Sequence, residues 1–480
     1  MESPYYFPVR GRTRNRSTPT GRAPGGVLPG VLPPMQDIPG CSALRPTDNE
    51  AYEKGLPVYN RRTEARPALR ALCSTPEAVA GVVDWARRNG VPFATRSGGH
   101  SYEGYCCSPD VVIDVQGLDS IDFDPREKTV SVGAGVTLGA IYKALRDRGD
   151  NIGFVAGTCP TVGVAGHVLG GGYGFLARAY GLACDNLLSV GLVDANGLRI
   201  QASATANADL FWACRGGGGG SFGIATDFTF QTRRVDGVYV FKLVWSLPKA
   251  RAKRLIKAWQ AWAPATHSAI TPLLKVGKTD TGVYGMRCIG QSIGTEAQLR
   301  RELAVLTAVE PTGVVIQHKT FFAAVDGFSG GWAYMSKYSK ERSDYVASLS
   351  DAGIDMLLDR LMGIPTGHVV ALLNAYGGAI NDVAAGDTAF AHRKGTGFCI
   401  HYYSEWELKR YTSSRLRESA SVFAPMRPHV SGGAYVNYCD ADLADYQHAY
   451  WGANLARLKQ IKRKYDPGNL FRHGQSVRPA

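Results

Sequence analysis

The chain has 480 residues, of which 45% are hydrophobic and 20% charged, with a formal net charge of +13. These are the values of an ordinary globular protein, long enough for two or three packed lobes. No run of eighteen apolar residues occurs, which argues against a spanning helix, so we expect a soluble protein. The compartment stays open between cytoplasmic and secreted.

The positive charge is spread out, which argues against a nucleic-acid partner. It gathers in a Pro/Gly-rich N-terminal segment and along a predicted helix near the C-terminus, at Arg10, Arg12, Arg14, Arg16 and Arg22 and at Arg457, Lys459, Lys462, Arg463 and Lys464. Neither cluster has the aromatic interleaving of a single-strand binder or a DNA-reading motif. We expect solvated faces, with no nucleic-acid and no membrane partner, and the sequence leaves the oligomeric state unknown.

The N-terminal segment and the cysteines bear on how the chain begins. Residues 1–40 are predicted to be a disordered lead-in, because Pro and Gly occur throughout and hydrophobic periodicity is weak. Cys41 follows it, and Cys106 and Cys107 are adjacent in a predicted loop. Two alternatives stay open: a disulfide from Cys41 to one of that pair, or free thiols throughout.

Helices and strands in mixed order predict an α+β lobe over residues 41–236. A helix is expected at 74–90, because Thr75 can cap it, Pro76 stands in its first turn and Asn89 with Gly90 ends it. Strands are expected at 91–96, 111–115, 121–123 and 129–132, and a further helix at 137–148.

The pattern changes at about residue 237. Long strands at 238–245, 282–290, 368–375 and 397–403 alternate with helices at 249–263, 295–308, 349–362 and 405–422. This order predicts an antiparallel sheet covered by helices, as a second domain over 237–430. In the C-terminal segment, 431–480, residues 442–465 are predicted to form one amphipathic helix that ends before Pro467.

Three glycine-rich segments are the first candidates for chemistry. Gly133, Gly135 and Gly139 nearly match a dinucleotide fingerprint, but the third glycine is late and the acidic residue is missing, so a tight strand-to-helix turn is favoured. The segments 157–174 and 216–223 are flanked by strand-like runs, which argues against flexible linkers. Such loops can point successive backbone N–H groups at a pyrophosphate.

Four motifs in one order carry a family resemblance. They are His100 in the segment 96–101 (Arg-Ser-Gly-Gly-His-Ser), Cys159 in Gly-Thr-Cys-Pro, the glycine run 216–223 and the segment 465–471 (Tyr-Asp-Pro-Gly-Asn-Leu-Phe). Over about residues 60–478 the chain resembles the berberine-bridge-enzyme-like group of the vanillyl-alcohol-oxidase flavoprotein superfamily. The resemblance implies an α+β fold with a two-lobed FAD-binding domain of the PCMH type and a substrate domain. It also implies FAD joined covalently to His100 at the 8α carbon and to Cys159 at C6, and a C-terminal segment that returns to the FAD-binding domain.

The chemistry explains these residue types. A neutral imidazole is a nucleophile, and a thiolate is the softer nucleophile suited to a ring carbon. Two covalent bonds would hold the flavin ring without a deep enclosing pocket, which leaves room for a wide substrate cleft. The alternatives are an ordinary loop histidine and a buried structural thiol.

The matching loops imply a larger cofactor-binding set and no metal site. The set comprises Arg96, Ser97, Gly98, Gly99, His100, Ser101, Gly157, Thr158, Cys159, Val162, Gly163, Gly166, His167, Gly174, Gly219, Gly223, Ile224 and Asn437. Val162 matches a family position that gates oxygen, where a small side chain leaves room for O2. This residue favours an oxidase over a dehydrogenase.

Tyrosines are the catalytic candidates that the resemblance implies. Tyr435 and Tyr438 lie in the family's Tyr-x-Asn-Tyr pattern, where a phenolate acts as general base. We favour Tyr438, with Tyr435 as a helper or a packing residue. A tyrosine has an ordinary pKa of about 10, so neighbours must stabilise the phenolate. Tyr173 is expected beside the flavin, with a packed core aromatic as the alternative.

Residues 393–406 resemble the strand that lines the substrate site in this family. They depart from the pattern of the plant members at Cys399 and His401, where those members have Lys and Gln or Glu. We expect His401 to be a second acid/base group, a substrate-binding residue or a structural histidine. Aromatic side chains could add stacking surfaces for a substrate, at Trp332, Tyr334, Tyr338, Tyr402 and Trp406.

The leading hypothesis is an FAD-linked oxidase with a doubly attached flavin. A hydroxyl group of a sugar, oligosaccharide or secondary metabolite would lose a hydride to flavin N5, and O2 would be reduced to H2O2. The alternatives are an oxidative cyclase or amine oxidase of the same family, a non-catalytic flavin-binding protein and a basic nucleic-acid binder.

Overall fold

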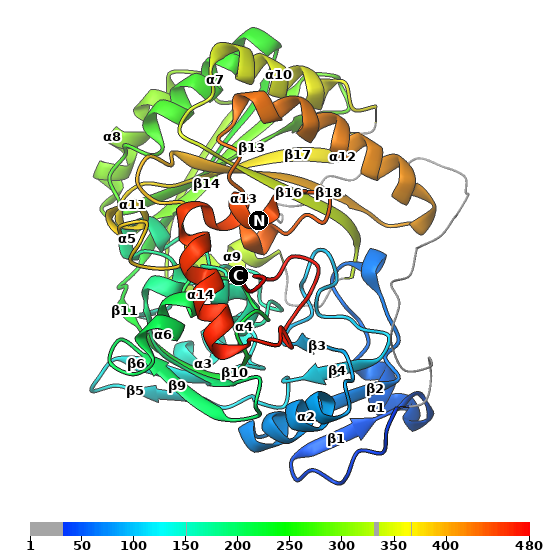
Figure 1. Ribbon diagram of the computed structural model, residues 1–480. Helices are drawn as coiled ribbons and strands as arrows, with labels where there is room; N and C mark the ends of the chain where they lie inside the picture. Colours follow the sequence, from blue (N-terminus) through cyan, green and yellow to red (C-terminus); the bar gives the residue numbers. More distant parts are fainter. Residues whose placement is uncertain (1–31, 150, 331–335, 366) are drawn as a thin grey trace.

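The structure is a computed structural model that describes residues 32–149, 151–330, 336–365 and 367–480. Figure 1 shows two layers: the strands that precede residue 235 form the lower one, and a large sheet with helices on its outer side forms the upper one. The mixed helix and sheet architecture confirms the α+β expectation.

The first sheet carries the loop of His100 at the end of a parallel strand. Its order is β1 (Cys41–Leu44), β2 (Leu69–Cys73), β4 (Val111–Asp114) and β3 (Phe93–Arg96), with α1 (Asn49–Lys54) and α2 (Pro76–Arg88) beside it. The predicted helix over 74–90 is confirmed as α2, where the Thr75 side chain accepts a hydrogen bond from Ala78 N at 3.1 Å. The buried face of α2 places Val79, Val82 and Val83 in the core of the lobe.

The second sheet lies beside the glycine-rich segments. Its order is β5 (Ile121–Asp124), β6 (Thr129–Gly133), β10 (Ile224–Gln231), β8 (Leu187–Val193) and β9 (Arg199–Ser203). A small pair, β7 (Ile152–Gly153) with β11 (Arg233–Arg234), flanks it, and four helices accompany it: α3 (Leu138–Arg146), α4 (Val164–Leu169), α5 (Ala177–Tyr180) and α6 (Ala208–Cys214). The segment 157–174 therefore enters α4, and the glycine run at 216–220 leaves α6.

The third sheet is antiparallel throughout its described strands. Its order is β15 (Gly313–Lys319), β12 (Val238–Leu247), β14 (Tyr284–Ser292), β13 (Ile270–Lys278), β17 (Val369–Ala375), β18 (Phe398–Trp406) and β16 (Tyr338–Val346). Helices α7 (Lys249–Trp262), α8 (Glu296–Thr307), α10 (Asp351–Met362) and α12 (Thr412–Met426) cover its outer face, and α9 (Phe321–Ser329) and α11 (Ala379–Asp382) lie in its connections. The predicted antiparallel sheet covered by helices is confirmed.

Strand alternation gives this sheet two different faces. One set of side chains packs with the covering helices in a separate core, for example Leu274, Ile400 and Tyr402. The side chains on the opposite face of the sheet, which include those of Leu273 and Leu372, pack with the core of the first lobe. The inner face of the sheet therefore forms the upper wall of the region between the two layers.

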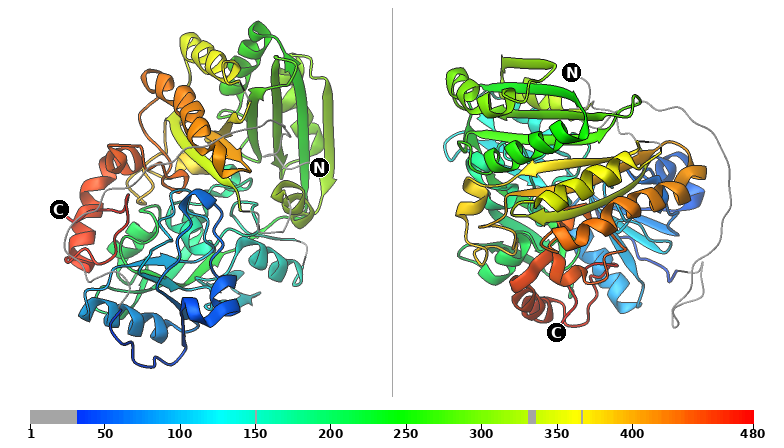
Figure 2. Two further views of the ribbon diagram at one scale, coloured as in Figure 1. Left: turned by 90° about the vertical axis from the view of Figure 1, so that its right-hand side faces the viewer. Right: turned by 90° about the horizontal axis from the view of Figure 1, so that it is seen from above.

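The C-terminal segment packs against the first lobe rather than the outer helices, as Figure 2 shows from two further sides. The expectation of one helix over 442–465 is wrong, because α13 (Tyr446–Trp451) and α14 (Leu455–Tyr465) are separated at Gly452, which has a φ of +46°. The ammonium group of Lys462 is buried and donates at 2.6 Å to Ser221 O and to the carboxylate of Asp466. This contact fixes the glycine run against α14.

The N-terminal expectations fall partly outside the described residues, which begin at 32. From there the chain lies along α2, where Trp85 Nε1 donates to Pro34 O at 3.1 Å. Cys41 is paired in register with Cys73 across β1 and β2, so a bridge from Cys41 to Cys106 or Cys107 is not what the fold favours, and all ten cysteines are free thiols. Among the described residues, every helix falls short of the length and apolar character needed to span a bilayer.

Candidate functional site

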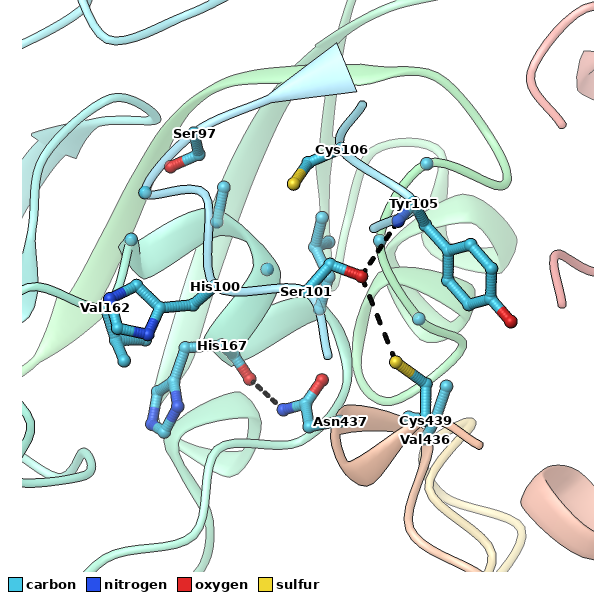
Figure 3. A pocket seen from close by; sticks show the side chains of 18 of the residues that line it. Ser97, His100, Ser101, Tyr105, Cys106, Val162, His167, Val436, Asn437 and Cys439 are labelled. Carbon is cyan, nitrogen blue, oxygen red and sulfur yellow. Dashed lines mark hydrogen bonds between the residues drawn. The ribbon is translucent and has the colours of Figure 1, made fainter. Parts of the chain in front are cut away.

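A cavity of about 360 Å³ lies where the loops of the first lobe, the inner sheet face and the C-terminal segment meet. Figure 3 shows its wall, with Ser97, His100 and Ser101 on the loop after β3, and Val436 and Asn437 on the C-terminal segment. The predicted cofactor-binding residues line this cavity, with Arg96 as the exception. Four segments far apart in sequence thus converge on one site.

Arg96 supports the site from behind. Its guanidinium group donates to the backbone carbonyls of Gly55 and Pro57, and the side chain is buried. These bonds anchor the end of β3, from which the His100 loop departs. Arg96 therefore holds the loop in place and does not line the cavity.

His100 is held in the form that a nucleophile requires. Its Nε2 atom lies 2.9 Å from Thr161 Oγ1, and its ring stacks on Tyr59 with centroids 4.9 Å apart. Burial, with the positive charge of Arg96 nearby, lowers the pKa of His100 to about 4. The imidazole is consequently neutral at physiological pH.

Cys159 contacts the same threonine hydroxyl. Its Sγ atom is 3.7 Å from Thr161 Oγ1, so one hydroxyl contacts both predicted attachment residues. Burial raises the pKa of the Cys159 thiol, while the hydrogen bond from Thr161 acts in the opposite direction. The thiol is therefore protonated at rest and must lose its proton before it can act as a nucleophile.

The glycines leave a space that suits a flat cofactor. A Cβ atom added at Gly166 would meet nothing within 4 Å, and one added at Gly219 would find Gly166 Cα as its nearest neighbour, at 3.8 Å. Both residues line the cavity, so side chains there would fill it. The geometry fits the FAD that the family resemblance implies.

Hydrogen bonds between loops hold this cradle together. His167 Nε2 accepts from Gly157 N at 3.0 Å, which requires a neutral acceptor nitrogen, and burial lowers the pKa of His167 to about 4. Asn437 Nδ2 donates to His167 O at 2.9 Å, a bond drawn in Figure 3. Asn437 thereby ties the C-terminal segment to α4.

The two candidate bases occupy different places. Tyr438 lines the cavity, whereas Tyr435 is 3% exposed and packs in the core. The Tyr435 hydroxyl oxygen accepts hydrogen bonds from Gly172 N at 2.9 Å and from Asn437 Nδ2 at 3.0 Å. Burial nevertheless raises the pKa of Tyr435, so its hydroxyl serves to position Gly172 and Asn437.

Tyr173 and Val162 both line the cavity. The Tyr173 hydroxyl donates to Ala375 O at 3.0 Å and its ring stacks on Tyr376, with centroids 5.6 Å apart. This places Tyr173 between the first lobe and strand β17. Val162 lies three residues after Cys159, and its side chain is one of those drawn in Figure 3.

His401 lies behind Tyr438, outside the cavity lining. The two rings are stacked, with centroids 3.8 Å and planes 11° apart. His401 Nε2 is 2.7 Å from Glu341 Oε2, and both side chains are buried. Cys399 is also buried, two residues before His401 on β18.

Several contributors were missing from the sequence-based prediction. Tyr59 and Glu341 touch His100 and His401 through contacts between distant segments, and no local motif marks them. Thr161 lies within the predicted cysteine loop, where its hydroxyl, two residues after Cys159, was the available signal. Leu273 and Asn374 line the cavity from the inner sheet face.

The five aromatic residues that could form stacking surfaces lie in different parts of the chain. Trp332 and Tyr334 lie outside the described residues. Tyr338 and Trp406 stack on one another with centroids 6.3 Å apart. Tyr402 is fully buried among the residues under the covering helices, so it faces away from the cavity.

Comparisons with known proteins agree with this geometry. Residues 67–203 match the family model for an FAD binding domain, and residues 434–478 match the model described as berberine and berberine like. The chain is 33% identical to berberine bridge enzyme-like D-1 of Nicotiana tabacum over 91% of this chain and 89% of that protein. It is 30% identical to reticuline oxidase of Eschscholzia californica, over 88% and 85%.

Solved structures similar to this one include an oxidase of oligosaccharides. The structure of a chitooligosaccharide oxidase superposes with a TM-score of 0.84, at 26% sequence identity, and the match covers 92% of this chain and 97% of that one. The two-lobed FAD-binding fold with a substrate domain is thus shared.

Proposed function

Since the chain belongs to the berberine-bridge-enzyme-like family of FAD-linked oxidoreductases, we propose that it is an oxidase with its flavin bonded to both His100 and Cys159. The donor is a hydroxyl group of a small molecule, and the acceptor is O2, which becomes H2O2. The proposal assigns residues 41–236 and 431–480 to the flavin and 237–430 to the substrate.

The observation that carries this proposal is that one hydroxyl, that of Thr161, contacts two cavity-lining nucleophiles. Its Oγ1 atom is 2.9 Å from His100 Nε2 and 3.7 Å from Cys159 Sγ. A neutral imidazole and a thiol at the wall of one cavity are the groups that two bonds to an electron-poor ring require.

Tyr438 is the proposed general base. Its phenolate removes the substrate hydroxyl proton, and it is the member of the Tyr435/Tyr438 pair that lines the cavity. Tyr435 and Asn437 hold the surrounding backbone through the bonds to Gly172 and His167. Tyr173 closes the cavity towards β17 and orients the substrate.

FAD held by these residues would supply the hydride acceptor and the redox chemistry that ends on O2. The small Val162 side chain at the cavity wall leaves room for O2, which supports an oxidase. Sugars, oligosaccharides and secondary-metabolite alcohols are the proposed substrate classes, and the similarity to a chitooligosaccharide oxidase supports the carbohydrate class.

A second candidate is an oxidative cyclase or amine oxidase acting on a secondary metabolite. The similarity to reticuline oxidase favours it. Under this alternative the same flavin site is kept and the product differs, so product analysis separates the two. A non-catalytic flavin-binding protein would show no flavin reduction by any donor.

The test is anaerobic reduction of the purified flavoprotein by a panel of sugars, oligosaccharides and alcohols, followed by H2O2 measurement in air. We expect at least one class to bleach the flavin and to yield H2O2. Tyr438→Phe should abolish turnover while the flavin stays attached, and Tyr435→Phe should retain part of it. Unchanged turnover in Tyr438→Phe would remove Tyr438 from the reaction.

A further inference from the structure

Three side chains are in contact one after another, starting at the cavity wall: Tyr438, His401 and Glu341. The Tyr438 and His401 rings lie face to face at 3.8 Å, and Nε2 of His401 is 2.7 Å from Oε2 of Glu341. Glu341 and His401 stand on neighbouring strands β16 and β18, where Ser343 is the direct partner of His401. The sheet therefore fixes the acid and the imidazole, and Tyr438 reaches them from the C-terminal segment.

Burial sets the protonation of the acid and the imidazole. Glu341 is 0% and His401 2% exposed. Loss of hydration raises the pKa of Glu341 well above its usual range and lowers the pKa of His401 to about 3. Both directions describe a neutral pair, in which the carboxylic acid of Glu341 donates to Nε2 of His401. Oε1 of Glu341 has no hydrogen-bond partner in the described part of the chain, which disfavours a carboxylate there.

We propose that Glu341 is a positioning residue for the base: it acts through His401 to stabilise the phenolate of Tyr438. The inference rests on the proposed role of Tyr438. When the Tyr438 hydroxyl loses its proton to solvent, the shared proton moves from Oε2 of Glu341 to Nε2 of His401. An imidazolium then lies face to face with the phenolate ring, the carboxylate lies at the Nε2 edge of the imidazolium, and the net charge of the three groups changes from zero to minus one.

The charged groups around the three side chains leave His401 as the partner of Glu341. Titratable groups come close from several elements, namely Lys340 on β16, Tyr403 and Glu405 on β18, Tyr435 on the C-terminal segment, and Arg62, Tyr102 and Glu103 from the first lobe. Lys340 is bound to Glu103 and Asp440, each at 2.6 Å, and Arg62 to Glu103 at 2.7 Å. The nearby cations are thus engaged by other carboxylates, and the group hydrogen-bonded to Glu341 is His401.

A purely structural role makes a different prediction. An amide can make the same single hydrogen bond to Nε2 of a neutral imidazole, so Glu341→Gln would preserve a packing contact. It cannot supply a proton, and the imidazole would stay neutral when Tyr438 ionises. Glu341→Gln therefore distinguishes a role in proton transfer from a role in packing alone.

The experiment is a pH titration of tyrosinate ultraviolet absorbance in the flavin-loaded protein. The Tyr438 signal is isolated as the difference between each protein and its Tyr438→Phe partner. In Glu341→Gln we expect the Tyr438 midpoint to rise by about one pH unit or more, with the attached flavin unchanged. No substrate is needed, so this outcome is independent of whether the proposed oxidase reaction is correct.

Two further variants make the result decisive. Asp344→Asn removes a buried carboxylate from the same strand, where it pairs with Arg427, and should leave the Tyr438 midpoint in place. His401→Phe keeps an aromatic stack without a charge and should raise the midpoint as Glu341→Gln does, which covers the case in which Glu341→Gln does not fold. An unmoved midpoint in a folded Glu341→Gln or His401→Phe protein overturns the proposal.

Discussion

The hydroxyl of Thr161 lies 2.9 Å from the imidazole of His100, on the same loop turn as Cys159. A hydrogen bond of this kind contributes about 1 kcal/mol, enough to orient a ring and to slow a reaction several-fold when it is lost. We expect Thr161→Val to bind FAD but to form both covalent bonds more slowly. The measurement is the fraction of flavin that stays with the denatured protein over time.

Thr161→Ser is the matched control, because it keeps the hydroxyl and loses only a methyl group. It should attach flavin at nearly the rate of the unmodified chain. If Thr161→Val attaches flavin equally fast, the hydroxyl does not align the two nucleophiles.

Val162 tests the choice between oxidase and dehydrogenase. It lines the cavity, and Val162→Leu adds one methylene at this position. We expect reoxidation of the reduced flavin by O2 to slow markedly, while anaerobic reduction by the donor changes little. Stopped-flow traces of the two half-reactions check this. Equal reoxidation rates in the two proteins would mean that Val162 does not control access of O2.

The local motifs could be predicted from sequence because their chemistry is contained in short segments. The loops around His100 and Cys159 are of this kind, as are the glycines at 166 and 219, whose missing side chains open the cavity. The break at Gly452 was missed because hydrophobic periodicity continues across it, while a positive φ ends the helix.

Contacts between distant segments could not be predicted in this way. Glu341 meets His401 across 60 residues, and Tyr59 contacts Glu405 across 346. Such pairs depend on strand register and lobe packing, which hydrophobic patterns leave open. The sequence therefore allows three roles for His401, and the structure shows its ring stacked on Tyr438.

Lys462 and Asp466 form a buried ion pair that holds the glycine run. The Lys462 ammonium also donates to the Ser221 and Phe471 carbonyls, each at 2.6 Å. Lys462→Met leaves the Asp466 carboxylate buried with two backbone N–H donors but no cation. We therefore expect the free energy of unfolding, measured in urea, to fall by about 3 to 5 kcal/mol. Adding Asp466→Asn to Lys462→Met should recover part of the loss. A single variant as stable as the unmodified chain contradicts this role.

Stability should fall on acidification because buried histidines resist protonation. Burial lowers the pKa of His392 to about 4, and its Nε2 lies 3.0 Å from Ala449 O. Above pH of about 6.5 both the folded and the unfolded forms are neutral, so His392 adds no pH dependence there. Between about 6.5 and 4 the unfolded form binds a proton that the folded form does not, and stability is lost as pH falls.

The check is the thermal midpoint of unfolding against pH for the unmodified chain and for His392→Gln. The variant should lose less stability between neutral pH and the acidic range, because it removes one group that titrates only on unfolding. Parallel curves for the two proteins would contradict the assignment.

The covalent attachment of FAD to His100 and Cys159 is tested most directly by acid precipitation of the purified yellow protein. We expect the flavin to remain in the pellet, and peptide mass spectrometry to find it on both residues. His100→Ala and Cys159→Ala should each keep one bond, and the double variant should release all the flavin. Flavin in the supernatant of the unmodified protein would contradict the central claim.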